Sequence, residues 1–342
     1  MAAQDRLSGP TPIDGPPPDV AHRGPRAPLA VVILTHNEEE NLPHALASVT
    51  GWAAEVWVVD AGSADRTVEI ARRAGAQVVA HAFAGYAAQR NWALRSLPFG
   101  QEWVLFLDAD EAATPGLRAE LAAVLASPPR EVAGYYVRRR FVFLGRWLRH
   151  GGYYPVWLLR VVRHRLARCE DRGVDEHLVV DGPTARLAHD LLHEDRRPLS
   201  RWVERHVRYA ELAAADLERP RAGAPPARWR SSEPSERARW WYERVYLRVP
   251  LGLRALAYFA YRYVLRGGFL DGREGLVYHV LQGLWYRVLV DAKIMERRLS
   301  RAPAPEPGRP AARPEAAPLR GTVVLRHRSP PARGTTDRAV ER

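Results

Sequence analysis

Four apolar segments of strand length alternate with segments of helical spacing over the first third of the chain. They are residues 29–35, 55–60, 77–81 and 102–108. Their apolar residues follow one another without the polar alternation of a half-exposed strand, so these strands are expected to be buried on both faces. Such strands, separated by helices, predict a mostly parallel sheet that helices cover. The chain is therefore expected to begin as an α/β fold.

Local signals predict where the helices of this fold begin. Asn37 is expected to cap the first helix and Asp65 the second, because Asn and Asp side chains accept hydrogen bonds from free backbone amides. A third helix is expected at 86–97. Thr114 followed by Pro115 predicts the start of a fourth.

The pattern changes after about residue 130. Segments 134–148 and 156–164 are expected to be strands with arginine on one face, added antiparallel to the sheet. Residues 172–183 suggest a loop, a strand and a turn, and 199–218 a helix.

Composition divides the chain further. Residues 1–28 (Pro/Gly-rich) and 299–342 (Arg/Pro-rich) lack apolar periodicity and are expected to be disordered. The first tail also lacks the apolar centre of a signal peptide. The α/β domain is expected at 29–218, a linker at 219–239 and a helical extension at 240–298.

The extension is aromatic and apolar, with an arginine every few residues. It carries too much charge for an unaided membrane span. Its spacing predicts helices with a basic face that lie at a membrane surface. Packing on the domain or on a twin subunit is the alternative, because aromatic and arginine side chains suit both environments.

The net charge of +12 is compatible with nucleic acid, anionic lipid or a phosphorylated substrate as partner, although an arginine-rich composition alone also produces it. The single cysteine, Cys169, rules out a disulfide within the chain and argues against a cysteine metal site. We expect it to be an ordinary, partly buried side chain.

The fourth strand ends in a group of acids, in the segment VLFLDADE (104–111). Asp108 and Asp110 are two residues apart, so on an extended chain they share a face, and Asp60 ends the second strand. Ligands of parallel sheets bind at such carboxyl ends, and carboxylates are the ligands that Mg²⁺ and Mn²⁺ prefer. A solvated acidic loop that caps the next helix is the alternative, because D-x-D alone is a weak motif.

Three motifs in order, THNEE (35–39), VDAGSAD (59–65) and LDADE (107–111), resemble the family 2 glycosyltransferases, which have the GT-A fold. The chain is most similar to their lipopolysaccharide core biosynthesis glucosyltransferase branch. The segments that carry this closer resemblance are QRNWAL (89–94), FLGRWLRHGGYYP (143–155), VDEH (174–177), LLH (191–193) and GFLDGREG (268–275).

The resemblance implies a GT-A Rossmann-like sheet and a helical, membrane-associating extension. It implies an inverting transferase that moves a hexose, glucose by default, from a UDP-sugar to a lipid-linked glycan such as lipopolysaccharide core. Mg²⁺ or Mn²⁺ would be the cofactor. A polyprenyl phosphate or another polysaccharide is the alternative acceptor. The implied location is cytoplasmic, peripheral on the inner face of the cytoplasmic membrane, with an anionic membrane surface and no nucleic acid as partner.

The resemblance also assigns residues. Asp110 would bind the metal directly, and His193 would approach it from the C-terminal side. Glu111, close to the next helix, is separately expected to be a bystander. The nucleotide-sugar would contact Thr35, Asn37, Glu38, Asp60, Arg90 and Asp108, with Asp60 on the base and Asp108 near the ribose and the metal.

The catalytic base is expected in the VDEH segment. The branch has His-Glu where this chain has Asp175-Glu176, so Glu176 aligns with the carboxylate and Asp175 is a second candidate. Alternatively, both acids hold nearby arginines such as Arg172.

The arginines between 138 and 149 suit a phosphorylated acceptor, and nearby aromatic side chains suit stacking on sugars. A solvated strand face with half-buried aromatics is the alternative. The residues concerned are Arg138, Arg139, Arg140, Arg146, Arg149, Trp147, Tyr153 and Tyr154.

Two other classes of protein fit less well. A dinucleotide-binding oxidoreductase should carry G-x-G-x-x-G after its first strand, where this chain has THNEE. A basic module that binds nucleic acid or lipid would account for the charge and the aromatics, but not for acids at the ends of two strands.

Overall fold

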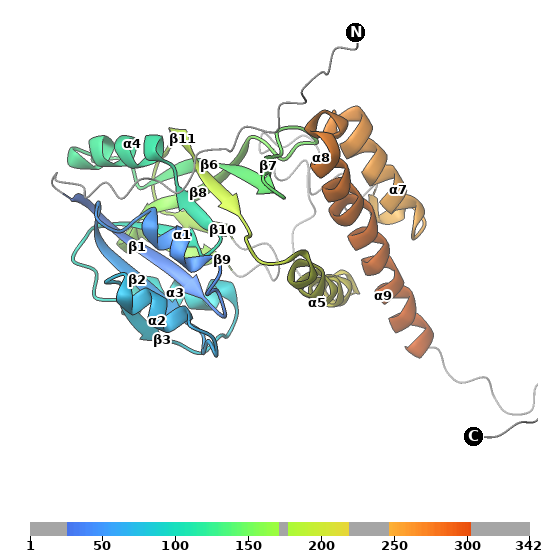
Figure 1. Ribbon diagram of the computed structural model, residues 1–342, viewed down its shortest axis with the longest axis horizontal. Coiled ribbons are helices and arrows are strands. Elements are labelled where there is room, and N and C mark those ends of the chain that lie inside the picture. Colours follow the sequence, from blue (N-terminus) through green and yellow to red (C-terminus); the bar gives the residue numbers. More distant parts are fainter. Residues whose placement is uncertain (1–25, 171–176, 219–245, 302–342) are drawn as a thin grey trace, which may run out of the picture. The chain divides into compact units, whose positions relative to one another are not determined.

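The computed structural model describes residues 26–170, 177–218 and 246–301. Within them lies a nine-stranded sheet with the order β3-β2-β1-β4-β8-β6-β11-β5, in which β7 pairs with β6 (Figure 1). A second sheet is the hairpin β9–β10. The strands are β1 (Ala27–Thr35), β2 (Ala53–Asp60), β3 (Gln77–Ala80), β4 (Trp103–Asp108), β5 (Glu111–Ala113), β6 (Gly134–Phe143), β7 (Arg146–Trp147), β8 (Val156–Arg163), β9 (Ala167–Glu170), β10 (His177–Val180) and β11 (Thr184–Glu194).

Strand direction decides where a ligand site can form. β1 pairs in parallel with β2 and β4, and β2 with β3. β8 is antiparallel to both β4 and β6, and β11 is parallel to β6. Six of the nine strands described in this sheet (β1, β2, β3, β4, β6 and β11) therefore run the same way. The expected mostly parallel sheet is confirmed, and the carboxyl ends of these strands lie along one edge.

Both faces of the sheet are covered, as the uninterrupted apolar strands predict. Leu29, Val31 and Ile33 pack with helices α1 (Leu42–Ala47), α2 (Thr67–Arg73) and α4 (Pro115–Ala126). Ala30 and Val32 face helix α3 (Tyr86–Ser96) and the β9–β10 hairpin. Alternate residues of β1 thus contribute to two separate apolar cores.

One of the three predicted helix caps is confirmed, since Thr114 accepts a hydrogen bond from the Leu117 amide. Asp65 accepts a hydrogen bond from the Thr67 amide, but the cap residue of α2 is Arg66, whose side chain makes no capping bond. The cap predicted at Asn37 is wrong. Asn37 has a left-handed backbone (φ 55°) and its side chain accepts from the Ala64 amide instead, so it joins two loops.

The C-terminal part is helical. It consists of α5 (Leu199–Glu218), a 3₁₀ turn at Tyr246–Arg248, α7 (Leu253–Ala260), a π-helical turn at Tyr261–Leu265, a 3₁₀ turn at Gly268–Asp271, α8 (Gly272–Tyr278), a second π-helical stretch at His279–Trp285, and α9 (Tyr286–Arg301). The linker expected at 219–239 and most of both expected tails lie outside the described residues. No helix in the described ranges is long and apolar enough to cross a membrane.

In the segment 253–265 the arginine side chains point inward and the large apolar side chains point outward, the reverse of an ordinary surface helix. Arg254 is buried in an ion pair with Asp291 of α9, and the Arg262 guanidinium lies 4.1 Å from the centre of the Tyr153 ring. The exposed side chains are apolar, namely Leu253, Leu256, Tyr261, Val264 and Leu265. The basic face expected to point outward is therefore turned inward along this segment. We call these five residues the apolar stripe.

A histidine and two glycines join the extension to the HGGYYP loop (150–155). His279 is fully buried, and a Cβ added at Gly268 would lie 2.2 Å from its Nε2, while one at Gly151 would lie 2.3 Å from its Cε1. The Gly151 amide donates to the Arg266 carbonyl (2.9 Å). Both glycines are therefore required by close packing against the imidazole.

We predict that Gly268→Ala destabilises the protein by about 1–3 kcal/mol, because the new methyl group would overpack the His279 site. Urea unfolding measures this change. Adding His279→Ala to Gly268→Ala should recover part of the loss, because it frees the space that the methyl group needs. Equal stability of Gly268→Ala and the unsubstituted protein would contradict this account of the joint.

Candidate active site

The acids at the end of β4 are held by a buried arginine. Arg160, on β8, is 6% exposed and donates to Asp108 Oδ2 (2.6 Å) and to Glu111 Oε1 (2.7 Å). Arg90, on α3, donates to Asp108 Oδ1 (2.9 Å). The Asp108 amide donates to Glu111 Oε2 (3.1 Å) and closes the turn between these two residues. One guanidinium thus makes two neighbouring carboxylates compatible with burial.

This arrangement fixes the charge of Asp108. Burial raises the pKa of its carboxyl, but the Arg160 and Arg90 guanidiniums outweigh burial and hold the pKa well below its usual range. Asp108 therefore stays ionised at neutral pH.

Two of these residues were not foreseen in their roles. Glu111, expected to be a bystander, is buried and bound to Arg160. Arg160 itself was not singled out, although its sequence signal was present as a single charge inside the apolar run VWLLRVV (156–162). A charge at a buried strand position implies a partner charge, because an unpaired one costs several kcal/mol.

Asp110 and His193 meet at the same edge. His193 Nε2 lies 3.6 Å from Asp110 Oδ2, and Nδ1 lies 3.7 Å from Glu111 Oε1. Burial lowers the pKa of the imidazole, but the carboxylates of Asp110 and Glu111 outweigh it, so the pKa of His193 is raised. The sequence placed these residues 83 positions apart, and β11 brings them together through its pairing with β5.

The donors present are compatible with a divalent cation. Neighbouring ligands of an octahedral ion bound at about 2.1 Å lie about 3 Å apart, close to the separation of the Asp110 and His193 donor atoms. Guanidiniums occupy both oxygens of Asp108, which leaves Asp110 and His193 as the donor pair. Among the described residues no group of three Asp, Glu, His or Cys side chains is arranged as metal ligands. Further ligands would therefore have to come from a substrate.

Asp60 and Thr35 form a second cluster at the ends of β2 and β1. The Thr35 hydroxyl donates to Asp60 Oδ1 (3.0 Å), and the amides of Gly62 and Ser63 donate to Oδ2 (3.0 and 2.9 Å). Ser63 Oγ adds a fourth donor. These four contacts hold the Asp60 carboxylate rigidly at the end of β2.

Glu38 belongs to a third cluster. It accepts from Arg197 (2.8 Å) and Asn41 (2.8 Å), and Arg197 also pairs with Asp195. Burial raises the pKa of Glu38 to about 7, while Arg197 and Asn41 oppose the rise. The Asp195 and Arg197 contacts tie the segment after β11 to the loop after β1.

The QRNWAL segment has a structural role that its sequence does not reveal. Asn91 accepts from the Cys169 amide (2.9 Å) and donates to the Cys169 carbonyl (2.8 Å), which fixes β9 against α3. Cys169 is buried. Asp175, Glu176 and Arg172 lie outside the described residues, in the connection between β9 and β10, so the assignment of the base stays a prediction.

The arginine and aromatic residues between 138 and 154 differ in role. Asp190 is 5% exposed and binds Arg138, Arg140 and the Tyr154 hydroxyl. Tyr153 is packed among Phe141, Tyr278 and His279. Two guanidiniums lie over the Trp147 ring, that of Arg140 at 4.4 Å and that of Arg149 at 4.0 Å from the ring centre. In this arrangement the three aromatic side chains already have protein partners, so sugar stacking is not the role that the packing favours.

Comparison with known proteins agrees with this geometry. Residues 30–178 match the family model described as glycosyl transferase family 2, a span that holds the Asp108–Asp110 turn and its two arginines. This segment is similar to glycosyl transferase family 2. An uncharacterized glycosyltransferase of Rickettsia typhi is 37% identical over 99 residues, 29% of this chain and 33% of that protein. One from Mycobacterium bovis is 37% identical over 142 residues, 40% of this chain and 62% of that protein. The first matches thus span about a third of those relatives.

Solved structures of similar proteins show distant likeness. A mannosyltransferase from Pyrobaculum calidifontis, in complex with GDP-Man and Mn²⁺, has 18% identity and a TM-score of 0.45, covering 80% of this chain and 88% of that one. S. aureus TarS (1–349) has 14% identity and a TM-score of 0.40, covering 80% and 91%.

We predict that Arg160→Met destabilises the protein by about 3–5 kcal/mol at pH 7.5, because it leaves the buried Glu111 carboxylate without its ion-pair partner and removes one of the two guanidiniums that bind Asp108. Urea unfolding measures this change. Arg73→Met, which removes an exposed ion pair with Glu69, is the control and should change stability by less than about 0.5 kcal/mol. A loss of stability in Arg160→Met as small as that in Arg73→Met would refute the role of Arg160 as the partner of these acids.

Proposed function

We propose that this protein is a glycosyltransferase that takes a sugar from a nucleotide-sugar donor. The observation that carries the proposal is the turn Asp108–Asp110, which faces His193 at the carboxyl edge of the sheet within a family 2 domain. Thr35, Asp60 and Glu38 lie at or just after the carboxyl ends of β1 and β2 and would complete a nucleotide pocket there, with Asn37 and Arg90.

In this proposal Asp110 and His193 hold a Mg²⁺ or Mn²⁺ ion, with phosphate oxygens of the donor as further ligands. When bound, such an ion stabilises the charge that develops on the leaving diphosphate. The rigidly held Asp60 carboxylate accepts a hydrogen bond from the base, as uracil would offer. Asp108, kept ionised by Arg160 and Arg90, accepts from a ribose hydroxyl.

The acceptor hydroxyl must lose a proton as it attacks the anomeric carbon. One carboxylate is enough as base for a single displacement, which inverts the configuration. Glu176, with Asp175 as the second candidate, is the proposed base, on the resemblance of the VDEH segment alone.

The finer proposal is transfer of glucose from UDP-glucose to a lipid-linked glycan such as lipopolysaccharide core, at the inner face of the cytoplasmic membrane. A polyprenyl phosphate or another polysaccharide is the alternative acceptor. The apolar stripe supports a membrane surface as partner, because transfer of its outward apolar side chains from water into lipid lowers the free energy. Arg266 and Arg273 are exposed nearby and complement anionic lipid.

We predict that Asp110→Ala abolishes metal-dependent hydrolysis of the donor and leaves the fold intact, because the Asp110 side chain faces His193 at the edge of the sheet and is not part of the apolar cores. A screen of UDP-, GDP- and dTDP-sugars with Mg²⁺ and Mn²⁺ identifies the donor first. Circular dichroism and urea unfolding of the variant provide the control. Unchanged turnover in Asp110→Ala would defeat the metal assignment, and no turnover of any donor by the unsubstituted protein would defeat the proposed activity.

We predict that Leu256→Glu combined with Leu265→Glu weakens binding to anionic vesicles by at least about tenfold, since each side chain contributes about 1.5 kcal/mol or more when it is buried in lipid. Cosedimentation with vesicles measures this. Leu212→Glu, an exposed position on α5, is the matched control. Vesicle binding by the double variant equal to that of the control would show that the apolar stripe does not contact lipid.

A further inference from the structure

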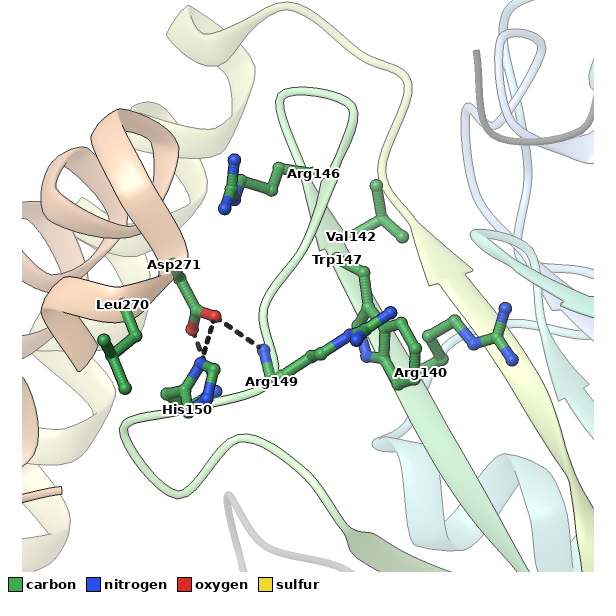
Figure 2. Close-up of a pocket in the computed structure, with 8 residues that line it drawn as sticks. All are labelled: Arg140, Val142, Arg146, Trp147, Arg149, His150, Leu270 and Asp271. Atoms are coloured by element: carbon green, nitrogen blue, oxygen red, sulfur yellow. Dashed lines mark hydrogen bonds and ion pairs between the residues drawn. The ribbon is translucent and has the colours of Figure 1, made fainter. Parts of the chain in front are cut away.

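A cavity of about 460 Å³ opens between the β6–β7 hairpin and the turn that precedes α8 (Figure 2). This volume lies in the range of small-molecule sites and exceeds the needs of a bare ion. The lining residues are Arg140, Val142, Arg146, Trp147, Arg149, His150, Leu270 and Asp271. We call it the hairpin pocket.

The hairpin pocket contains more positive charge than the surrounding acids compensate. Arg140 shares one carboxylate, that of Asp190, with Arg138. Arg149 is exposed and has no carboxylate within ion-pair distance among the described residues, and Arg146 is 3.9 Å from Glu274, at the limit of an ion pair. Two guanidinium charges therefore lack a carboxylate of their own.

The acid of the pocket does not offset these charges. The Asp271 carboxylate accepts from the amides of Arg149 (3.1 Å) and His150 (2.9 Å) and contacts the His150 ring (2.7 Å). Figure 2 shows these contacts on the side of the turn away from the Arg149 guanidinium. Asp271 thus holds the loop in place and leaves the guanidiniums to a ligand.

Trp147 adds a hydrogen-bond donor to the hairpin pocket and restrains the side chains of two of its arginines. The guanidiniums of Arg140 and Arg149 both lie over its ring, at 4.4 and 4.0 Å from the ring centre, so cation–π attraction holds both charges at this ring. Its Nε1–H is buried and has no acceptor among the described residues. An anion would relieve the repulsion between the guanidiniums, and its oxygen atoms are the acceptors that these N–H groups lack.

The position of the hairpin pocket relates it to the proposed active site. It is at the carboxyl end of β6, which runs in the same direction as β4 and β11, so it shares an edge of the sheet with Asp110 and His193. Arg140 stands opposite Leu192 on β11, the neighbour of His193. Leu270, which lines the pocket, is 55% exposed.

We propose that the hairpin pocket binds a phosphoryl group carried by the acceptor, an inference that rests on the proposed transferase function. A phosphomonoester has a charge of about −1.5 to −2 at neutral pH, which matches the two uncompensated guanidiniums better than a single carboxylate does. The glycosyl acceptor hydroxyl would be held at the common edge while the phosphoryl group is anchored in the pocket.

Binding of glucose 6-phosphate, measured by titration calorimetry without donor or metal, tests this site. Arg149→Gln should weaken binding by at least about tenfold, because it removes charge-assisted hydrogen bonds. Trp147→Phe, which keeps the ring but loses the N–H, should weaken it several-fold. Arg72→Gln, at an exposed arginine of α2, is the matched control and should bind as the unsubstituted protein does.

Two sources of the phosphoryl group are distinguished by a second arm with vesicles of phosphatidylcholine, with and without phosphatidic acid. Loss of phosphatidic acid binding in Arg149→Gln supports a lipid headgroup as the source, and loss of glucose 6-phosphate binding supports a phosphorylated glycan. The proposal is overturned if the unsubstituted protein binds neither probe, if Arg149→Gln binds both as the control does, if glucuronate binds more tightly than glucose 6-phosphate, or if UDP displaces the probe.

These results are independent of the donor screen. Absence of donor hydrolysis together with Arg149-dependent phosphate binding would reject the proposed function and leave an anion-binding pocket. Donor hydrolysis without phosphate binding would reject the hairpin pocket alone.

Discussion

The Arg160 guanidinium, buried between Asp108 and Glu111, is the interaction on which the site depends. Three acids within four residues at the end of a buried strand would repel one another and resist desolvation. Arg160 supplies one positive charge from the neighbouring strand β8 and binds two of the three. Asp110 is thereby left as the carboxylate that can face His193 and a ligand. The acidic turn is stable because β8, an antiparallel strand from later in the sequence, pairs with β4 and places Arg160 beside the turn.

Strand direction extends this arrangement to the rest of the edge. β8 lies between β4 and β6 and is antiparallel to both of them. β6, and β11 beside it, therefore run in the same direction as β4. His193, the hairpin pocket and the Asp108–Asp110 turn consequently occupy one edge, although they come from segments up to 163 residues apart, from Asp108 to Asp271. A fully parallel extension would have needed a crossover helix for each strand, whereas the antiparallel β8 makes the return directly.

The helical extension is part of this edge rather than an appendage. Asp271 fixes the loop at 149–150, and His279 fits against Gly151 and Gly268. These contacts explain why the two glycine-rich segments, HGGYYP and GFLDGREG, occur in one chain. The same packing turns Arg254 and Arg262 inward and leaves the apolar stripe outside, an arrangement whose hydrophobic cost in water is removed at a lipid surface.

The sequence by itself determined the α/β core and the positions of most helices and strands, because short-range sequence patterns specify buried strands and helix starts. The run at 29–35, the Thr114–Pro115 start and the helix at 199–218 needed no distant information. The D-x-D acids and the motif order likewise indicated the edge where a site would form.

Only the tertiary structure decided which charges meet. The partner of Asp108 is Arg160, 52 residues away, and the partner of Asp110 is His193, 83 residues away, and no local pattern specifies such pairings. The cap predicted at Asn37 was wrong for the same reason, because its side chain is used by the Ala64 amide of another loop. The direction in which the extension turns its arginines also depends on long-range contacts, since Arg254 is buried only because Asp291 lies opposite it. Local periodicity fixes which residues share a face, but the partner available to that face determines whether it points inward or outward.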